Sequence, residues 1–119
     1  MSYYPLTTIP DYYLMDDLLT DEHKLIRQSV RDWVESFVMP KIDEAAQNHT
    51  DIPNLMKELG KIGALGPYIP EEYGGSGLDQ ISYGIIMQEL ERGDSAVRSA
   101  ASVQSLLVMF PINEYGSEE

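Results

Sequence analysis

Apolar residues recur at helical spacing over a long stretch in the first half of the chain. Thr20 can cap this helix, and the two acidic residues that follow it suit the positive end of a helix dipole. The pattern continues to about Asn48, although Pro40 should kink or interrupt it. The apolar positions that define the first part are Leu25, Ile26, Val30, Trp33, Val34, Phe37 and Val38.

Three further helices follow from the same periodicity. The second is predicted to start near Pro53, a residue suited to the first helical position, and a glycine-rich loop follows it. Asp79 can cap the third, which Gly93 should break. Asp94 or Ser95 can cap the fourth, which is predicted to run to about residue 110 and to be buried on most sides. No strand is predicted, so the fold class is all-α, a compact bundle of about four helices.

The first nineteen residues lack helical periodicity and contain two prolines and four tyrosines. We therefore expect residues 1–19 to form an extended arm and residues 20–119 to form the helical domain. The length of 119 residues suits one core.

Charge and composition exclude several classes of function. Twenty acidic residues against eight basic ones give a net charge of -12, which would repel nucleic acid and anionic membrane surfaces. The chain has no cysteine, no secretory signal pattern and no continuous run of the ~20 apolar residues that cross a bilayer. We therefore expect a soluble, cytoplasmic protein with no membrane or nucleic-acid partner.

Common catalytic motifs are absent. The cluster Gly74, Gly75 and Gly77 has no preceding strand and no following Lys-Ser or Lys-Thr, so it is interpreted as a turn and not as a phosphate loop. His23 and His49 belong to no metal-ligand pattern and are interpreted as solvated surface residues. No metal site and no catalytic residue is predicted in this chain.

Arg98 stands out because it begins an otherwise uncharged run. At steps of three and four it shares one helix face with hydroxyl side chains, Ser95, Ser99, Ser102 and Ser105. A buried guanidinium needs a partner. One interpretation is an internal ion pair with Glu91 or Asp94; the other is an anion site for a carboxylate ligand. The pattern alone favours the internal pair.

Two longer runs, ELGKIGALGPYIPEEYGGSGLD and QELERGDSAVRSAASVQSLLVMFPINEYGSEE, resemble the N-terminal helical domain of acyl-CoA dehydrogenases. The second is similar specifically to glutaryl-CoA dehydrogenase, and the resemblance covers about residues 17–119. It implies FAD as cofactor, a middle β domain, a C-terminal helical bundle and a homotetramer in the complete enzyme. It also implies oxidative decarboxylation of glutaryl-CoA to crotonyl-CoA.

The same resemblance assigns substrate-binding roles to Arg98, Ser99, Ser102 and Glu91. Arg98 and the hydroxyls would hold the distal carboxylate of the substrate, while Glu91 would position the arginine. The chain looks truncated before the flavin-binding β domain, because Ser117 and the following glutamates look like the start of a helix. We therefore expect this chain alone to bind no FAD and to be inactive, with the missing domains as its partners.

Two alternatives stay open. The chain could belong to a dehydrogenase for an uncharged short-chain acyl-CoA, in which Arg98 is used internally by Glu91. It could also be a non-catalytic helical interaction module.

Overall fold

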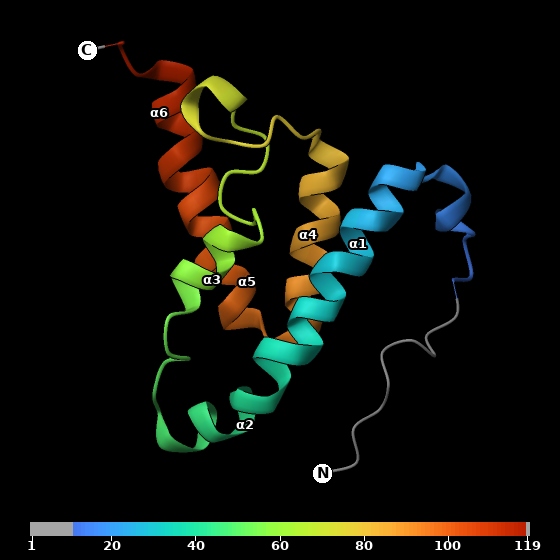
Figure 1. Cartoon of the computed structure of the whole chain (residues 1–119), viewed down its shortest axis with the longest axis vertical. Coiled ribbons are helices and arrows are strands. Elements are labelled where there is room, and N and C mark those ends of the chain that lie inside the picture. The colour runs from blue at the N-terminus through green and yellow to red at the C-terminus, as the bar shows by residue number, and fades with distance from the viewer. Residues whose placement is uncertain (1–10, 119) are drawn as a thin grey trace.

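The computed structural model describes residues 11–118, which form an all-α fold, as predicted, with no strand in this range. Its helices are η2 (Met15–Leu18), α1 (Asp21–Trp33), η3 (Val34–Val38), α2 (Met39–Asn48), α3 (Leu55–Lys61), η4 (Glu71–Tyr73), α4 (Gln80–Gly93), α5 (Ser95–Ser102), η5 (Val103–Met109) and α6 (Phe110–Tyr115). The described part measures 52 × 40 × 19 Å. Helix α4 packs against α1 on one side and α5 on the other, and α3 lies against α5 (Figure 1).

The first helix is continuous from α1 through η3 to α2. Thr20 caps it by accepting a hydrogen bond from the His23 backbone N–H, at 3.2 Å. The segment η3 is π-helical and ends two residues before Pro40, which cannot donate a backbone hydrogen bond. The wider turn absorbs the proline without ending the helix, so the predicted span to Asn48 is confirmed.

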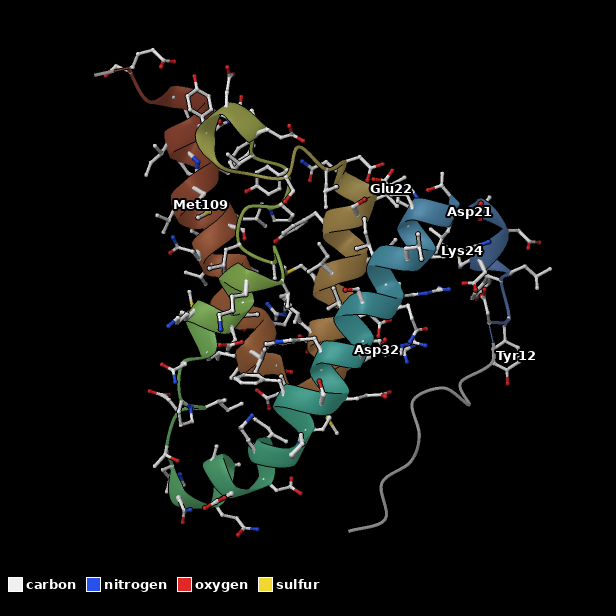
Figure 2. All side chains as sticks on the ribbon, in the orientation of Figure 1. Tyr12, Asp21, Glu22, Lys24, Asp32 and Met109 are labelled. Carbon is white, nitrogen blue, oxygen red and sulfur yellow. The ribbon has the colours of Figure 1, made fainter. Side chains whose placement is uncertain are left out.

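The core lies where α1, η3, α4 and α5 meet. Its buried members are Val30, Val34, Val38, Ala45, Ile52, Leu59, Ala64, Ile86, Leu90, Val97 and Ala101. The charged side chains of Asp21, Glu22 and Asp32 on α1 are instead exposed (Figure 2).

Helix α4 ends at Gly93, as predicted, and Asp94 after it has an extended backbone. The glycine also has a packing role that was not predicted. A Cβ on Gly93 would lie 2.6 Å from Val34 Cγ1. The glycine therefore allows α4 to approach η3 closely.

The second helix begins two residues later than predicted, at Leu55, because Asn54 adopts a left-handed conformation with φ of 61°. The following glycine cluster forms the predicted turn. A Cβ on Gly75 would lie 1.9 Å from the Ile69 carbonyl oxygen, so this tight turn requires glycine.

The fourth helix runs without a break from Ser95 to Tyr115. Asp94 caps it, as predicted, and Pro111 starts its last turns after the π-helical η5. By length and composition alone this helix could cross a membrane, which was not predicted from the sequence, although helices of soluble proteins pass the same test. Its second half is exposed, so the expectation of burial on most sides is wrong for the described residues; the exposed apolar side chains are Val103, Leu106, Leu107, Val108 and Ile112.

Only residues 11–19 of the predicted arm lie within the described range. They are not extended throughout, because Met15–Leu18 forms a 3₁₀ helix. Arg27 holds Asp16 of this turn with two hydrogen bonds, of which the one from Nη2 is 2.8 Å long. Ser117 and Glu118 follow α6 without helical structure, and Glu119 lies outside the described residues, so the helix start expected there stays a prediction.

Candidate functional site

The candidate site lies where the last turn of α4 meets the first turns of α5. Arg98 Nε donates to Glu91 Oε2 at 2.6 Å, and Nη1 donates to Ser102 Oγ at 3.3 Å. Ser95 Oγ donates to the other Glu91 oxygen at 2.5 Å. The structure therefore brings three of the four predicted substrate-binding residues into one hydrogen-bonded group.

Local capping produces this geometry. The Asp94 carboxylate accepts hydrogen bonds from the backbone N–H groups of Ala96 and Val97, at 2.7 and 3.2 Å, which fixes the start of α5 directly after α4. Glu91 and Arg98 are seven residues apart in sequence, and this short connection turns them toward each other. Asp94 is thus used as a cap, which leaves Glu91 as the arginine's acidic partner.

The electrostatics of the pair are those of a surface site. The side chains of Arg98 and Glu91 are 35% and 46% exposed. Hydrogen bonds from Arg98 and then Ser95 lower the pKa of Glu91, so this carboxyl group is ionised at neutral pH. Arg98 is therefore partly exposed, and the burial predicted for it from the apolar helix is wrong.

Two other serines predicted on the same helix face as Arg98 have different roles. Ser99 takes part through its backbone carbonyl, which accepts a hydrogen bond from Ser102 Oγ at 3.2 Å. Ser105 is fully buried, and its hydroxyl accepts a hydrogen bond from the Gly66 N–H at 2.9 Å. Ser105 therefore fixes the loop before η4 and does not extend the polar group around Arg98.

Arg98 keeps hydrogen-bonding capacity in this arrangement. Its Nη2 group makes no hydrogen bond to any residue in the range 11–118, and Glu91 uses only Nε. A guanidinium has five donors in a planar fork that matches a carboxylate. Arg98 can therefore bind an anionic ligand while it stays paired with Glu91.

A second arginine–carboxylate pair was not predicted. Glu89 is 1% exposed and accepts hydrogen bonds from Arg31 Nε and Nη2 at 3.0 and 2.8 Å, with Arg92 Nε 3.6 Å away. Glu89 follows Ile85 and Ile86 at the same helical spacing as the buried residues of α4, which was the available signal. This pair links α1 to α4 through the core.

His23 is buried, so the prediction of a solvated residue is wrong. Its Nδ1 accepts a hydrogen bond from the Thr20 N–H at 3.3 Å, and its Nε2 lies 2.9 Å from Asp79 Oδ2. Asp79 also caps α4 by accepting from the Ser82 N–H at 2.7 Å. His23 therefore joins the starts of α1 and α4, whereas His49 is exposed at the end of α2, as predicted.

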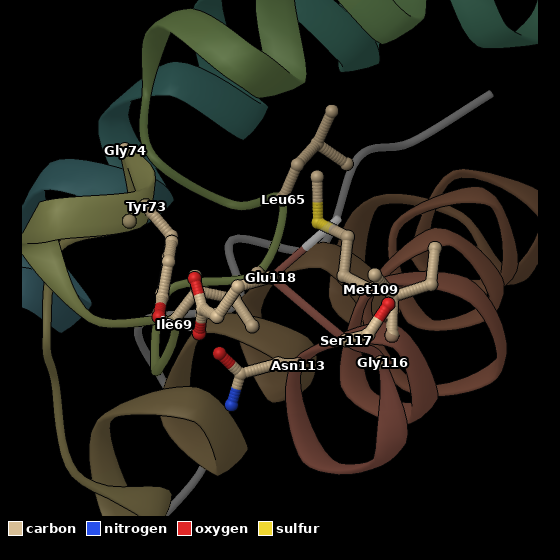
Figure 3. Close-up of a pocket in the computed structure, with 12 residues that line it drawn as sticks. Leu65, Ile69, Tyr73, Gly74, Met109, Asn113, Gly116, Ser117 and Glu118 are labelled. Atoms are coloured by element: carbon tan, nitrogen blue, oxygen red, sulfur yellow. Dashed lines mark hydrogen bonds between the residues drawn. The ribbon is translucent and has the colours of Figure 1, made fainter.

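A cavity of about 390 Å³ lies at the far end of the fourth helix from Arg98. Tyr73, Asn113 and Glu118 approach one another at this cavity from three different segments (Figure 3), and the Tyr73 hydroxyl donates to Glu118 Oε1 at 2.8 Å. Its lining residues are Leu65, Gly66, Ile69, Tyr73, Gly74, Gly75, Met109, Ile112, Asn113, Gly116, Ser117 and Glu118. This lining carries a glutamate and no basic side chain, so it does not fit the pyrophosphate of FAD. Within residues 11–118 no group of three His, Asp or Glu side chains could hold a metal ion.

Comparison with known proteins agrees with this fold. The family described as "Acyl-CoA dehydrogenase, N-terminal domain" matches residues 20–119. The chain therefore belongs to the acyl-CoA dehydrogenase family and corresponds to its N-terminal domain.

Individual relatives fall into more than one substrate group. A crystal structure of glutaryl-CoA dehydrogenase from Mycobacterium smegmatis in complex with FADH2 is similar with a TM-score of 0.85 and 39% identity, over 89% of this chain and 27% of that one. Glutaryl-CoA dehydrogenase of Desulfococcus multivorans is 35% identical over 87% of this chain and 28% of its own length. Human mitochondrial short-chain specific acyl-CoA dehydrogenase is 34% identical over 85% of this chain and 24% of its own length.

The chain spans only a part of each relative. This share is 19% for a probable acyl-CoA dehydrogenase of Bacillus subtilis and 28% for the Desulfococcus enzyme. The Desulfococcus and human enzymes, which belong to two substrate groups, are also almost equally similar to this chain, at 35% and 34% identity. Overall similarity therefore assigns the family but not the acyl group.

Proposed function

We propose that this chain is the acyl-pocket domain of an FAD-dependent acyl-CoA dehydrogenase that acts on glutaryl-CoA. The observation that carries the proposal is the group formed by Arg98, Glu91 and Ser102, because a glutaryl group ends in a carboxylate and ordinary fatty acyl groups do not. An apolar acyl pocket accepts such a charge only if a cation is present.

Each residue of the group has a distinct part in the proposal. Arg98 would bind the distal carboxylate of the substrate through its unused donors, and the Ser102 hydroxyl would add a neutral hydrogen bond. Glu91 would hold the guanidinium in place before the substrate arrives. Ser99 would contribute its hydroxyl to the same carboxylate.

The remaining chemistry would come from other parts of the enzyme. FAD would accept the hydride from the acyl chain, and a carboxylate base would remove the α-proton. The cavity at Tyr73 and Glu118 does not fit FAD, so we assign no cofactor-binding residue to this chain. In this proposal the chain alone is inactive, and its partners are the middle and C-terminal domains of a cytoplasmic homotetramer.

The test uses the complete gene product, assayed for dye reduction with glutaryl-CoA and with butyryl-CoA. Arg98→Leu should lower kcat/KM for glutaryl-CoA by at least roughly 30-fold, equivalent to about 2 kcal/mol, and should leave butyryl-CoA oxidation unchanged. Arg27→Leu is the control. It removes the charge of an arginine that lies in α1, outside the site, and is paired with Asp16, and it should leave the ratio of the two activities unchanged.

A second candidate function is oxidation of an uncharged short-chain acyl-CoA. The observation that favours it is the 2.6 Å ion pair, in which the negative charge of Glu91 already compensates the positive charge of Arg98. In that case wild type should prefer butyryl-CoA, and Arg98→Leu should not alter the preference. That outcome would replace the glutaryl proposal.

A further inference from the structure

The Tyr83 hydroxyl is a buried polar group that the fold itself does not satisfy. Its oxygen is buried and has no hydrogen-bond partner within residues 11–118. Tyrosine hydroxyls that are buried nearly always have a partner, because an unpaired one costs about 1–3 kcal/mol. A ligand that supplies this hydrogen bond would account for a tyrosine at this position.

Tyr83 lies on the side of α4 that faces the candidate site. Tyr83, Met87 and Glu91 are spaced four residues apart, so they share one face of α4, and Glu91 is the residue that binds Arg98. Two helical turns, about 12 Å along the axis, separate Tyr83 from Glu91. Helix α4 is in contact with α5, the helix that carries Arg98 (Figure 1).

The neighbouring tyrosine does not supply the missing partner. The rings of Tyr83 and Tyr68 meet edge to face with centroids 5.5 Å apart. The Tyr68 hydroxyl donates to the Ser105 carbonyl oxygen at 2.5 Å. The Tyr68 hydroxyl thus makes a hydrogen bond within the fold, whereas the Tyr83 hydroxyl makes none within residues 11–118.

The charge of Arg98 acts on this hydroxyl. Burial raises the pKa of Tyr83, and the positive charge of Arg98 opposes this rise. The Tyr83 hydroxyl is therefore neutral at physiological pH. The charge that acts on it is that of Arg98, which the proposed function assigns to binding of the substrate carboxylate.

We infer that Tyr83 is a further specificity-determining residue of the acyl pocket, whose hydroxyl binds the carboxylate end of a dicarboxylic acyl group, directly or through one bridging water. This inference rests on the proposed function. A hydrocarbon acyl chain cannot satisfy the hydroxyl, so an acyl group that carries oxygen is favoured over one that does not.

Tyr83→Phe in the complete gene product tests the inference, because it removes only the hydroxyl. The ratio of kcat/KM for glutaryl-CoA to that for butyryl-CoA should fall about 5- to 10-fold, mostly through a higher KM for glutaryl-CoA. The melting temperature should stay the same or rise, because no hydrogen bond within the fold is lost. Tyr68→Phe is the matched control: it should lower the melting temperature and leave the ratio unchanged.

The outcomes are distinguishable. If wild type oxidises glutaryl-CoA and Tyr83→Phe keeps the wild-type ratio, the inference is wrong and the proposed function stands. A Tyr83→Phe protein that melts as low as Tyr68→Phe would also overturn it, since the hydroxyl would then have a partner within the fold. If wild type does not oxidise glutaryl-CoA, both the proposed function and the inference fail.

Discussion

The buried pair of Arg31 and Glu89 gives the sharpest prediction about stability. Glu89 is 1% exposed, whereas the Arg31 side chain is 18% exposed. Arg31→Met would leave the carboxylate buried with only Arg92, whose Nε is 3.6 Å away. Removing one partner of a buried pair costs about 3–5 kcal/mol, and we expect about 3 kcal/mol here because Arg92 remains.

Substitution of the other partner should cost less. Glu89→Gln keeps the side-chain volume and one acceptor oxygen, and Arg31 is partly exposed, so its guanidinium can reach water. We expect a loss of about 1–2 kcal/mol in the free energy of unfolding. Arg31→Met should therefore lose more free energy of unfolding than Glu89→Gln, because the charge that it leaves unpaired is the buried one.

Urea unfolding of the chain, followed by circular dichroism, measures both losses. With an m-value of about 1.5 kcal/mol/M, a loss of 3 kcal/mol lowers the unfolding midpoint by about 2 M. Lys61→Ala is the control: its ion pair with Glu58 is exposed, and it should cost about 0–1 kcal/mol. An Arg31→Met midpoint equal to that of Lys61→Ala would refute the reasoning.

Two further predictions concern helix packing and capping. Gly84→Ala should stabilise the chain by about 0.5–1 kcal/mol, because its Cβ would meet open space. Gly93→Ala should instead destabilise the chain by about 1–3 kcal/mol, because its Cβ would clash with Val34. Thermal unfolding of both variants checks these values. Hydrogen bonds from the first turn of α4 and from His23 lower the pKa of Asp79 to about 2 from its ordinary 3.8, so their stabilisation is present above about pH 4 and is lost as the pH falls through about 2. In a plot of melting temperature against pH, Asp79→Asn should therefore show a smaller fall than wild type between about pH 4 and pH 2. An equally steep fall in the two proteins would contradict this.

Helix starts were predictable because capping is decided within a few residues. Thr20, Asp79 and Asp94 each accept hydrogen bonds from backbone groups two or three positions later, as their sequence contexts indicated. The π-helical segments were not predicted. Both precede a proline inside a continuous helix, at Pro40 and Pro111, so the proline gave the position of the irregularity but not its form.

Contacts between distant parts of the chain were the main omission. Glu89 meets Arg31 across 58 residues, and His23 meets Asp79 across 56. Helical spacing assigns a side chain to a face but does not say which other helix that face meets. The pair of Glu91 and Arg98 was predictable because a single connection of known length separates its members.

The two glutamates of α4 show why only one of these pairs suits a ligand. Glu89 and Glu91 are two residues apart, so they face different neighbours, Arg31 in α1 and Arg98 in α5. An exposed ion pair contributes about 0–1 kcal/mol, so a carboxylate ligand can share or displace Glu91 at small cost. Displacing Glu89 would leave a charge in the core and cost several kcal/mol. The exposure of the paired glutamate, 46% for Glu91 against 1% for Glu89, is therefore the property that lets Arg98, and not Arg31, bind the substrate carboxylate in this proposal.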